Sequence, residues 1–139
     1  MIVADSTLLV HFALPVARVN DVLAAKDVYR QDSVWRATPL WKSEVRNVGV
    51  KYMRAGDLSL GDLTDALAVL DDMLRESVET VEHDEVLRAA LGFGLSGYDA
   101  EYVALAERLG VPLVTSDKRV LLAVGRAVAP GDFAASAPR

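Results

Sequence analysis

Short apolar runs that favour β-strands alternate along this chain with longer segments of helical periodicity, and this alternation constrains the fold most. Parallel strands need a crossover between them, usually a helix, so the alternation predicts strands that run in one direction. The sequence therefore predicts an α/β fold: a single domain with a central parallel sheet of about four to five short strands, flanked by helices on both faces. The predicted strands are 2–4, 34–38, 78–82, 113–115 and 126–128.

Helices are predicted where apolar residues recur at spacings of three and four after a capping residue. Ser96 stands three residues before Asp99, which is the pattern of a capping box. Pro15 fits the first turn of a helix. The predicted helices are 6–14, one from Pro15, 41–55, one opened at 59–62, 84–91, one from Ser96 to Gly110, and 118–123. The helix from Pro15 is expected to carry one face formed by Val19, Val22, Leu23 and Lys26.

Neither a repeat nor a linker divides the chain, so we expect one domain over residues 1–130 and a short flexible tail at 131–139. An apolar fraction of 52% supports a globular core. No apolar stretch approaches the roughly 18 residues of a membrane span, and the first residues do not resemble a signal peptide. We therefore expect a cytoplasmic protein without a membrane partner. The lack of cysteine excludes disulfides, zinc–thiolate sites and cysteine nucleophiles.

The net charge is −5, from 20 acidic and 15 basic residues. Nucleic-acid binders usually carry a basic surplus, so this balance argues against simple electrostatic binding of nucleic acid. It does not argue against an enzyme whose acids surround divalent cations, because the cations reverse the local charge. The question is whether the acids converge on one place.

Four acids are expected at the carboxyl edge of the sheet, where open α/β folds bind their ligands. Asp5 and Asp117 follow the first and fourth predicted strands, and Glu44 and Asp99 lie in first turns of helices. Carboxylate oxygens are suitable ligands for Mg²⁺ or Mn²⁺. Two such ions can stabilise the attacking and leaving oxygens of a phosphoryl displacement.

Each acid also has an ordinary structural interpretation. Asp117 suits the cap of the following helix, Asp99 completes the box with Ser96, and Glu44 suits a solvated first turn. Asp5 is the hardest to explain in this way, because an acid beside a buried strand needs a partner or a ligand.

Four blocks of sequence resemble the PIN domain of the VapC type, in order and spacing across nearly the whole chain. The most specific block lies between residues 98 and 120. The blocks are Met-Ile-Val-Ala-Asp at 1–5, Pro39-Leu40 with Glu44 and Asn47, Tyr98-Asp99-Ala100 with Tyr102-Val103-Ala104-Leu105-Ala106, and Val114-Thr115-Ser116-Asp117-Lys118-Arg119.

The resemblance implies an acidic quartet, Asp5, Glu44, Asp99 and Asp117, that binds Mg²⁺ or Mn²⁺. It implies an endoribonuclease that cuts single-stranded regions of RNA and leaves a 5′-phosphate and a 3′-hydroxyl. Family members of this kind are toxins of type II toxin–antitoxin pairs, usually homodimers held inactive by a cognate VapB-like antitoxin. Where the family commonly has a small residue and then Ser after the first acid, this chain has Ser6 and Thr7.

Further residues are expected to support the quartet. Thr7 and Thr115 place hydroxyls beside Asp5 and Asp117, so we expect Thr7 to hydrogen-bond Asp5 or a water at the site. Asn47 lies at i+3 from Glu44, on the same side of its helix, where it either orients that carboxylate or is an ordinary surface amide. The basic residues that lie near the same edge, and are either RNA contacts or solvated charges, are Lys42, Arg46, Lys118 and Arg119.

Three alternatives stay open. A phosphoacceptor receiver domain is also small, acidic and α/β, but receivers carry an adjacent acidic pair after the first strand, where this chain has only Asp5. A PIN fold can also serve as a non-catalytic binding module or as an RNA-maturation nuclease without an antitoxin. Sequence does not separate the last of these from a toxin.

Overall fold

A computed structural model describes residues 1–16 and 18–136 and contains the predicted parallel sheet. Its four strands lie in the order β2-β1-β3-β4, and each neighbouring pair is parallel. The α/β prediction is therefore confirmed, and the four strands lie within the predicted four to five. The strands are β1 (Ile2–Ala4), β2 (Trp35–Arg36), β3 (Leu113–Val114) and β4 (Ala127–Val128).

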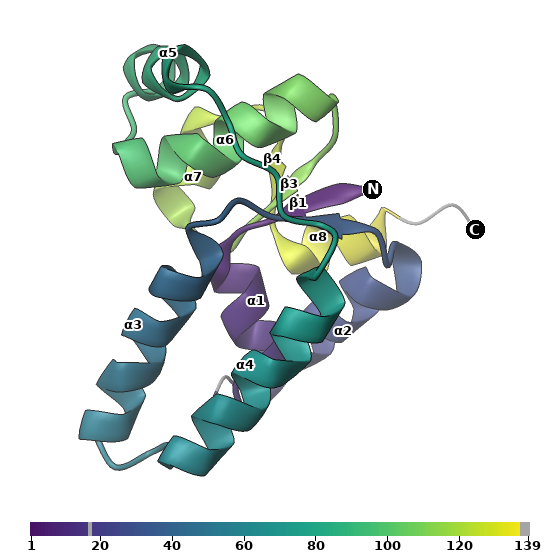
Figure 1. The fold of residues 1–139 in the computed structure, drawn as a ribbon. Helices are drawn as coiled ribbons and strands as arrows, with labels where there is room; N and C mark the ends of the chain where they lie inside the picture. The colour runs from purple at the N-terminus through teal and green to yellow at the C-terminus, as the bar shows by residue number, and fades with distance from the viewer. Residues whose placement is uncertain (17, 137–139) are drawn as a thin grey trace.

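Eight helices within the described residues surround the sheet. In Figure 1, α3 and α4 form a long hairpin that projects away from the sheet, while α5, α6 and α7 lie on its other side. The helices are α1 (Ser6–Ala13), α2 (Val19–Gln31), α3 (Trp41–Arg54), α4 (Leu60–Leu74), α5 (His83–Phe93), α6 (Gly97–Leu109), α7 (Lys118–Ala123) and α8 (Pro130–Ala135). Among these residues, no helix has the length and apolar character that a bilayer crossing requires.

The central strand β1 separates two hydrophobic cores. Ile2 and Ala4 belong to the core formed with α1 to α4, whereas Val3 belongs to the core formed with α5, α6 and α7. Successive side chains of a strand point to opposite faces, so a fully apolar strand is suited to a sheet covered on both sides. Burial of both faces fixes β1, and with it the position of the acid that follows.

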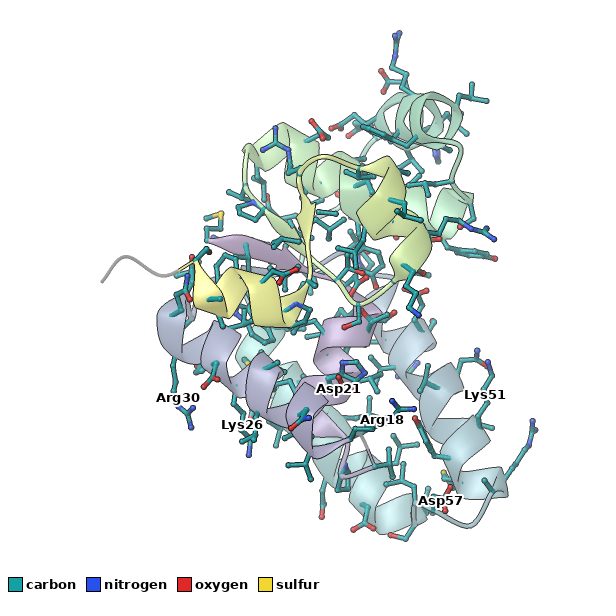
Figure 2. All side chains as sticks on the ribbon, turned by 180° about the vertical axis from the view of Figure 1, so that it is seen from behind. Arg18, Asp21, Lys26, Arg30, Lys51 and Asp57 are labelled. Carbon is teal, nitrogen blue, oxygen red and sulfur yellow. The ribbon has the colours of Figure 1, made fainter. Side chains whose placement is uncertain are left out.

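Helix α2 differs from its prediction in where it begins and which face it buries. It begins at Val19 rather than near Pro15, and residue 17 lies outside the described residues. The buried residues are Ala25 and Val28, whereas Val19 is 72% exposed. Figure 2 shows Lys26 pointing outward from this helix, so Lys26 lies on the solvent face rather than beside the core.

Two further predictions differ from the structure. The predicted strand 78–82 is reduced to one bridge between Val78 and Ala37. The predicted flexible tail contains helix α8, in which Pro130 is buried and Phe133 packs against the core. Residues 137–139 of that tail lie outside the described residues.

Candidate functional site

The strand order places a crevice beside the first strand. The chain passes from β1 to β2 on one side, and β3 then adds on the other side of β1. Open α/β sheets bind ligands where the strand order reverses in this way, at the carboxyl ends of the strands. Asp5 follows β1 directly, and Asp117 lies three residues after β3. The topology alone therefore brings these two acids to the same crevice.

Asp5 is buried and held by three hydrogen bonds. Its Oδ1 accepts from the Thr7 hydroxyl at 2.6 Å and from the backbone N–H of Leu8 at 3.2 Å, and its Oδ2 accepts from the Thr115 hydroxyl. The Leu8 contact makes Asp5 the N-cap of α1. Burial raises the pKa of Asp5 to about 6, and the nearby charge of Glu44 adds to this, while the three donors oppose it.

The same two hydroxyls fasten the loop after β3. The Thr7 hydroxyl accepts a hydrogen bond from the backbone N–H of Ser116 at 2.8 Å. The Thr115 hydroxyl accepts from the backbone N–H of Asp117 at 3.0 Å. Each threonine therefore contacts Asp5 and also fixes the backbone that carries Asp117.

Glu44 reaches the crevice from the first turn of α3. Burial raises the pKa of Glu44, and the charges of Asp99 and Glu101 add to this, while the hydroxyls of Tyr102 and Ser6 lie close enough to lower it. Its Oε1 is buried and makes no hydrogen bond of normal geometry within the described residues. A buried carboxylate oxygen without a donor is rare in folded proteins.

Asp99 and Asp117 complete the row of acids. Asp99 lies in the first turn of α6, and Asp117 caps α7 by accepting from the N–H groups of Arg119 and Val120 at 2.9 and 3.2 Å. Burial raises the pKa of Asp99, the charge of Asp117 adds to this, and Ser96 and Arg119 oppose it. Each acid thus influences the next, in the order Asp5, Glu44, Asp99, Asp117.

This row fits a divalent cation in its chemistry. All the possible ligands are carboxylate oxygens that repel one another, and Oε1 of Glu44 is buried without a hydrogen-bond partner among the described residues. Within residues 1–16 and 18–136, however, no three acids stand close enough to form a ready-made cation site. Binding would therefore require some of these carboxylates to move closer together.

The other basic and amide candidates are mostly not brought to this crevice. Lys42 pairs with Asp71 at 2.9 Å and lies over the Trp41 ring. Asn47, Arg46 and Lys118 are exposed, and no contact with the acidic row is found for them in the described part of the chain. Arg119 is different, because its charge lowers the pKa of Asp99.

Sequence reasoning missed Tyr102 on α6 and Thr38 in the turn after β2. Tyr102 lies at i+3 from Asp99 and is buried beside Glu44, but its position in an apolar stripe indicated only a core residue. Thr38 is fully buried and its hydroxyl donates to Glu101 at 3.0 Å. The one signal that pointed to Tyr102 was this spacing from an acid already in the candidate site.

A small cavity adjoins the acids between α1 and α3. Its volume is about 190 Å³, and Ser6 and Thr7, which contact or approach Asp5 and Glu44, form part of its wall. The remaining lining residues are Val10, His11, Val48 and Tyr52. The crevice therefore continues from the carboxylates along the two helices.

No family model matches this chain, but similar proteins are found among curated proteins and among solved structures. A curated protein named Exonuclease VapC9, from Pyrobaculum aerophilum, is 53% identical over 38 residues. That segment is 27% of this chain and 29% of the relative, so less than a third of the relative's length is matched. The crystal structure of PAE2754 from the same organism superposes with a TM-score of 0.70 at 27% identity. The superposition covers 96% of this chain and 93% of the PAE2754 chain.

The structural match spans the whole sheet and its helices, and the sequence match is short but high in identity. Neither match assigns a role to any residue of the acidic row. Together, the two matches support a VapC-type PIN-domain protein, although the sequence match is partial.

Proposed function

We propose that this protein is a Mg²⁺- or Mn²⁺-dependent endoribonuclease that cleaves single-stranded regions of RNA. The observation that carries the proposal is the row of acids beside the crevice between β1 and β3, in which, in addition to burial, Glu44 raises the pKa of Asp5, Asp99 that of Glu44, and Asp117 that of Asp99. The name of the curated relative, which includes the word exonuclease, supports a nuclease in general terms. The proposal assigns phosphodiester hydrolysis to this crevice.

Asp5, Asp99 and Asp117 would hold the cation, and Glu44 would either join them or orient water at the site. A cation bound there supplies Lewis-acid stabilisation of the phosphate and activation of the attacking water. The hydroxyls of Thr7 and Thr115 each donate to one oxygen of Asp5, so hydrogen bonds orient this carboxylate from both sides. Arg119, beside Asp99, is placed to contact a phosphate oxygen of the RNA.

Internal rather than terminal cleavage is supported by the position of the row. Asp99 and Asp117 are partly exposed at the edge of the sheet, where a strand of RNA can continue in both directions. The curated relative is named an exonuclease, so the test must distinguish cleavage within the RNA from cleavage at its ends. A circular RNA has no ends, and only an endonuclease can open it.

The regulatory part of the proposal is that the protein is a toxin of a type II pair, a cytoplasmic homodimer inhibited by a VapB-like antitoxin. The motif resemblance and the name of the curated relative support this part. Co-purification with the product of a neighbouring small gene, followed by loss of cleavage in the complex, is the expected result. Full cleavage with no inhibitory partner would instead indicate an RNA-maturation nuclease.

The decisive experiment incubates the purified protein with linear and circular single-stranded RNA and with a transfer-RNA pool, with Mn²⁺, Mg²⁺ or a chelator. Asp5→Asn and Asp99→Asn are compared with Asp27→Asn, which alters an exposed acid that pairs with Arg30 on α2. Cation-dependent opening of the circle, lost in the first two variants and kept in the third, is expected. If no RNA is cut and calorimetry detects no cation, the protein is a non-catalytic binding module.

A further inference from the structure

Tyr102 brings a hydroxyl to the buried side of the acidic row. It lies one helical turn after Asp99 on α6, so both side chains leave the same face of the helix. Its side chain is 3% exposed, and its hydroxyl is buried without a hydrogen-bond partner in the described part of the chain. A tyrosine hydroxyl in such a position usually has a partner, so its presence here needs an explanation.

The Oε1 of Glu44 is the complementary group. It is an acceptor, it is also buried, and it also lacks a partner of normal geometry within the same residues. The two groups act on each other. Burial is the largest cause of the raised pKa of Tyr102, and the negative charge of Glu44 is the next. In return, the hydroxyl of Tyr102 lowers the pKa of Glu44. The Thr38 hydroxyl donates to Glu101, so it does not serve Glu44 instead.

We propose that Tyr102 is a positioning residue whose hydroxyl donates a hydrogen bond to Oε1 of Glu44 and holds that carboxylate in the crevice. One bond between them satisfies both buried groups. It also leaves the other oxygen of Glu44 free to face a cation, a consequence that rests on the proposed function. Tyr102 therefore acts through Glu44 and touches neither cation nor RNA.

The contact itself is tested without any cation. Urea unfolding is measured in a chelator at pH 7.5 for wild type, Tyr102→Phe, Glu44→Gln and the double variant. Tyr29→Phe removes the same oxygen from an aromatic cluster with Phe12 and Trp35 and is the matched control. Tyr102→Phe is expected to lower the urea midpoint in the wild-type background and to have a clearly smaller effect beside Glu44→Gln. An unchanged or raised midpoint, equal in both backgrounds, would mean that the hydroxyl is truly unpartnered and would overturn the proposal.

The consequence for the cation is measured separately, by calorimetric titration with Mn²⁺ alone. Partners that orient a ligand typically change metal affinity by about 10- to 100-fold, so Tyr102→Phe is expected to weaken Mn²⁺ binding within that range while Tyr29→Phe leaves it unchanged. Equal affinities for wild type and Tyr102→Phe would contradict the positioning role. If wild type itself binds no Mn²⁺, the proposed function fails, while the unfolding cycle still decides whether Tyr102 holds Glu44.

Discussion

The hydroxyl of Thr115, just after β3, donates a hydrogen bond to Oδ2 of Asp5, just after β1. Both side chains are buried, and 110 positions separate them in the sequence. Their contact closes the crevice between the two central strands at the edge where the acids meet. A second hydroxyl, from Thr7, binds the other oxygen of the same carboxylate at 2.6 Å.

Thr115→Val is expected to destabilise the protein by about 1–3 kcal/mol, because it removes a donor from a buried carboxylate while keeping the shape of the side chain. The pKa of Asp5 is expected to rise further, since this hydrogen bond lowers it. Urea unfolding at pH 7.5 measures the first effect, and a carboxyl NMR titration measures the second. Thr80→Val, at an exposed threonine, is the control. Equal stability of both variants would contradict the importance of the contact.

Stability is expected to fall as pH rises from about 4 to about 7. The folded protein holds the Asp5 proton up to about pH 6, whereas the unfolded chain releases it near 3.8, so the folded state binds more protons across this window. The difference corresponds to about 3 kcal/mol, lost on ionisation of the buried acid. Asp5→Asn is expected to flatten this decline, because asparagine keeps the helix cap without a titrating group.

Chemical denaturation at several pH values, in a chelator, provides this comparison. Glu44 and Asp99 also have raised pKa values, so part of the slope is expected to persist in Asp5→Asn. Parallel curves for wild type and variant would show that Asp5 does not titrate in this window.

Arg119→Gln is expected to raise the pKa of Asp99, because the guanidinium charge now lowers it. Lys118→Gln, at the neighbouring exposed residue, is expected to leave that pKa unchanged. Carboxyl NMR titration of both variants measures the difference. If the two substitutions shift Asp99 equally, its environment responds to general surface charge rather than to Arg119.

Gly49→Ala is expected to destabilise the α3–α4 hairpin. A Cβ at Gly49 would lie 2.5 Å from Cδ1 of Leu63, and such overpacking costs about 1–3 kcal/mol, more than the helix propensity of alanine returns. Gly92→Ala in α5 meets no atom within 4 Å and is expected to be neutral or stabilising. Thermal unfolding of both variants provides the measurement, and a stabilised Gly49→Ala would mean that Leu63 moves aside freely.

The parts of the fold that could be predicted are those set by local rules. The apolar stripe of α3 and the Ser96 cap of α6 are readable because period and capping act within a few residues. The buried face of α2 could not be read, because α8 packs against it, and the sequence predicted that segment as a flexible tail. The predicted strand 78–82 forms a single bridge, between Val78 and Ala37. A short apolar run does not by itself determine whether an adjacent strand pairs with it along its whole length.

The acidic row could be predicted because strand ends and helix first turns meet at one edge in this class of fold. The side chains that surround these acids could not be predicted, because Tyr102 and Thr38 reach the site through tertiary contacts. The spacing of Glu44 and Asp99 within their helices does not indicate which hydroxyls surround them.

The strand order also fixes when the crevice can exist during synthesis. Its first acid emerges at position 5, but β3 begins only at Leu113, and Asp117 follows it. A nascent chain therefore carries Asp5 without Thr115 and Asp117 until most of the polypeptide has left the ribosome. Products of premature termination before this strand lack both the Thr115 contact and Asp117, so incomplete translation yields fragments without this crevice.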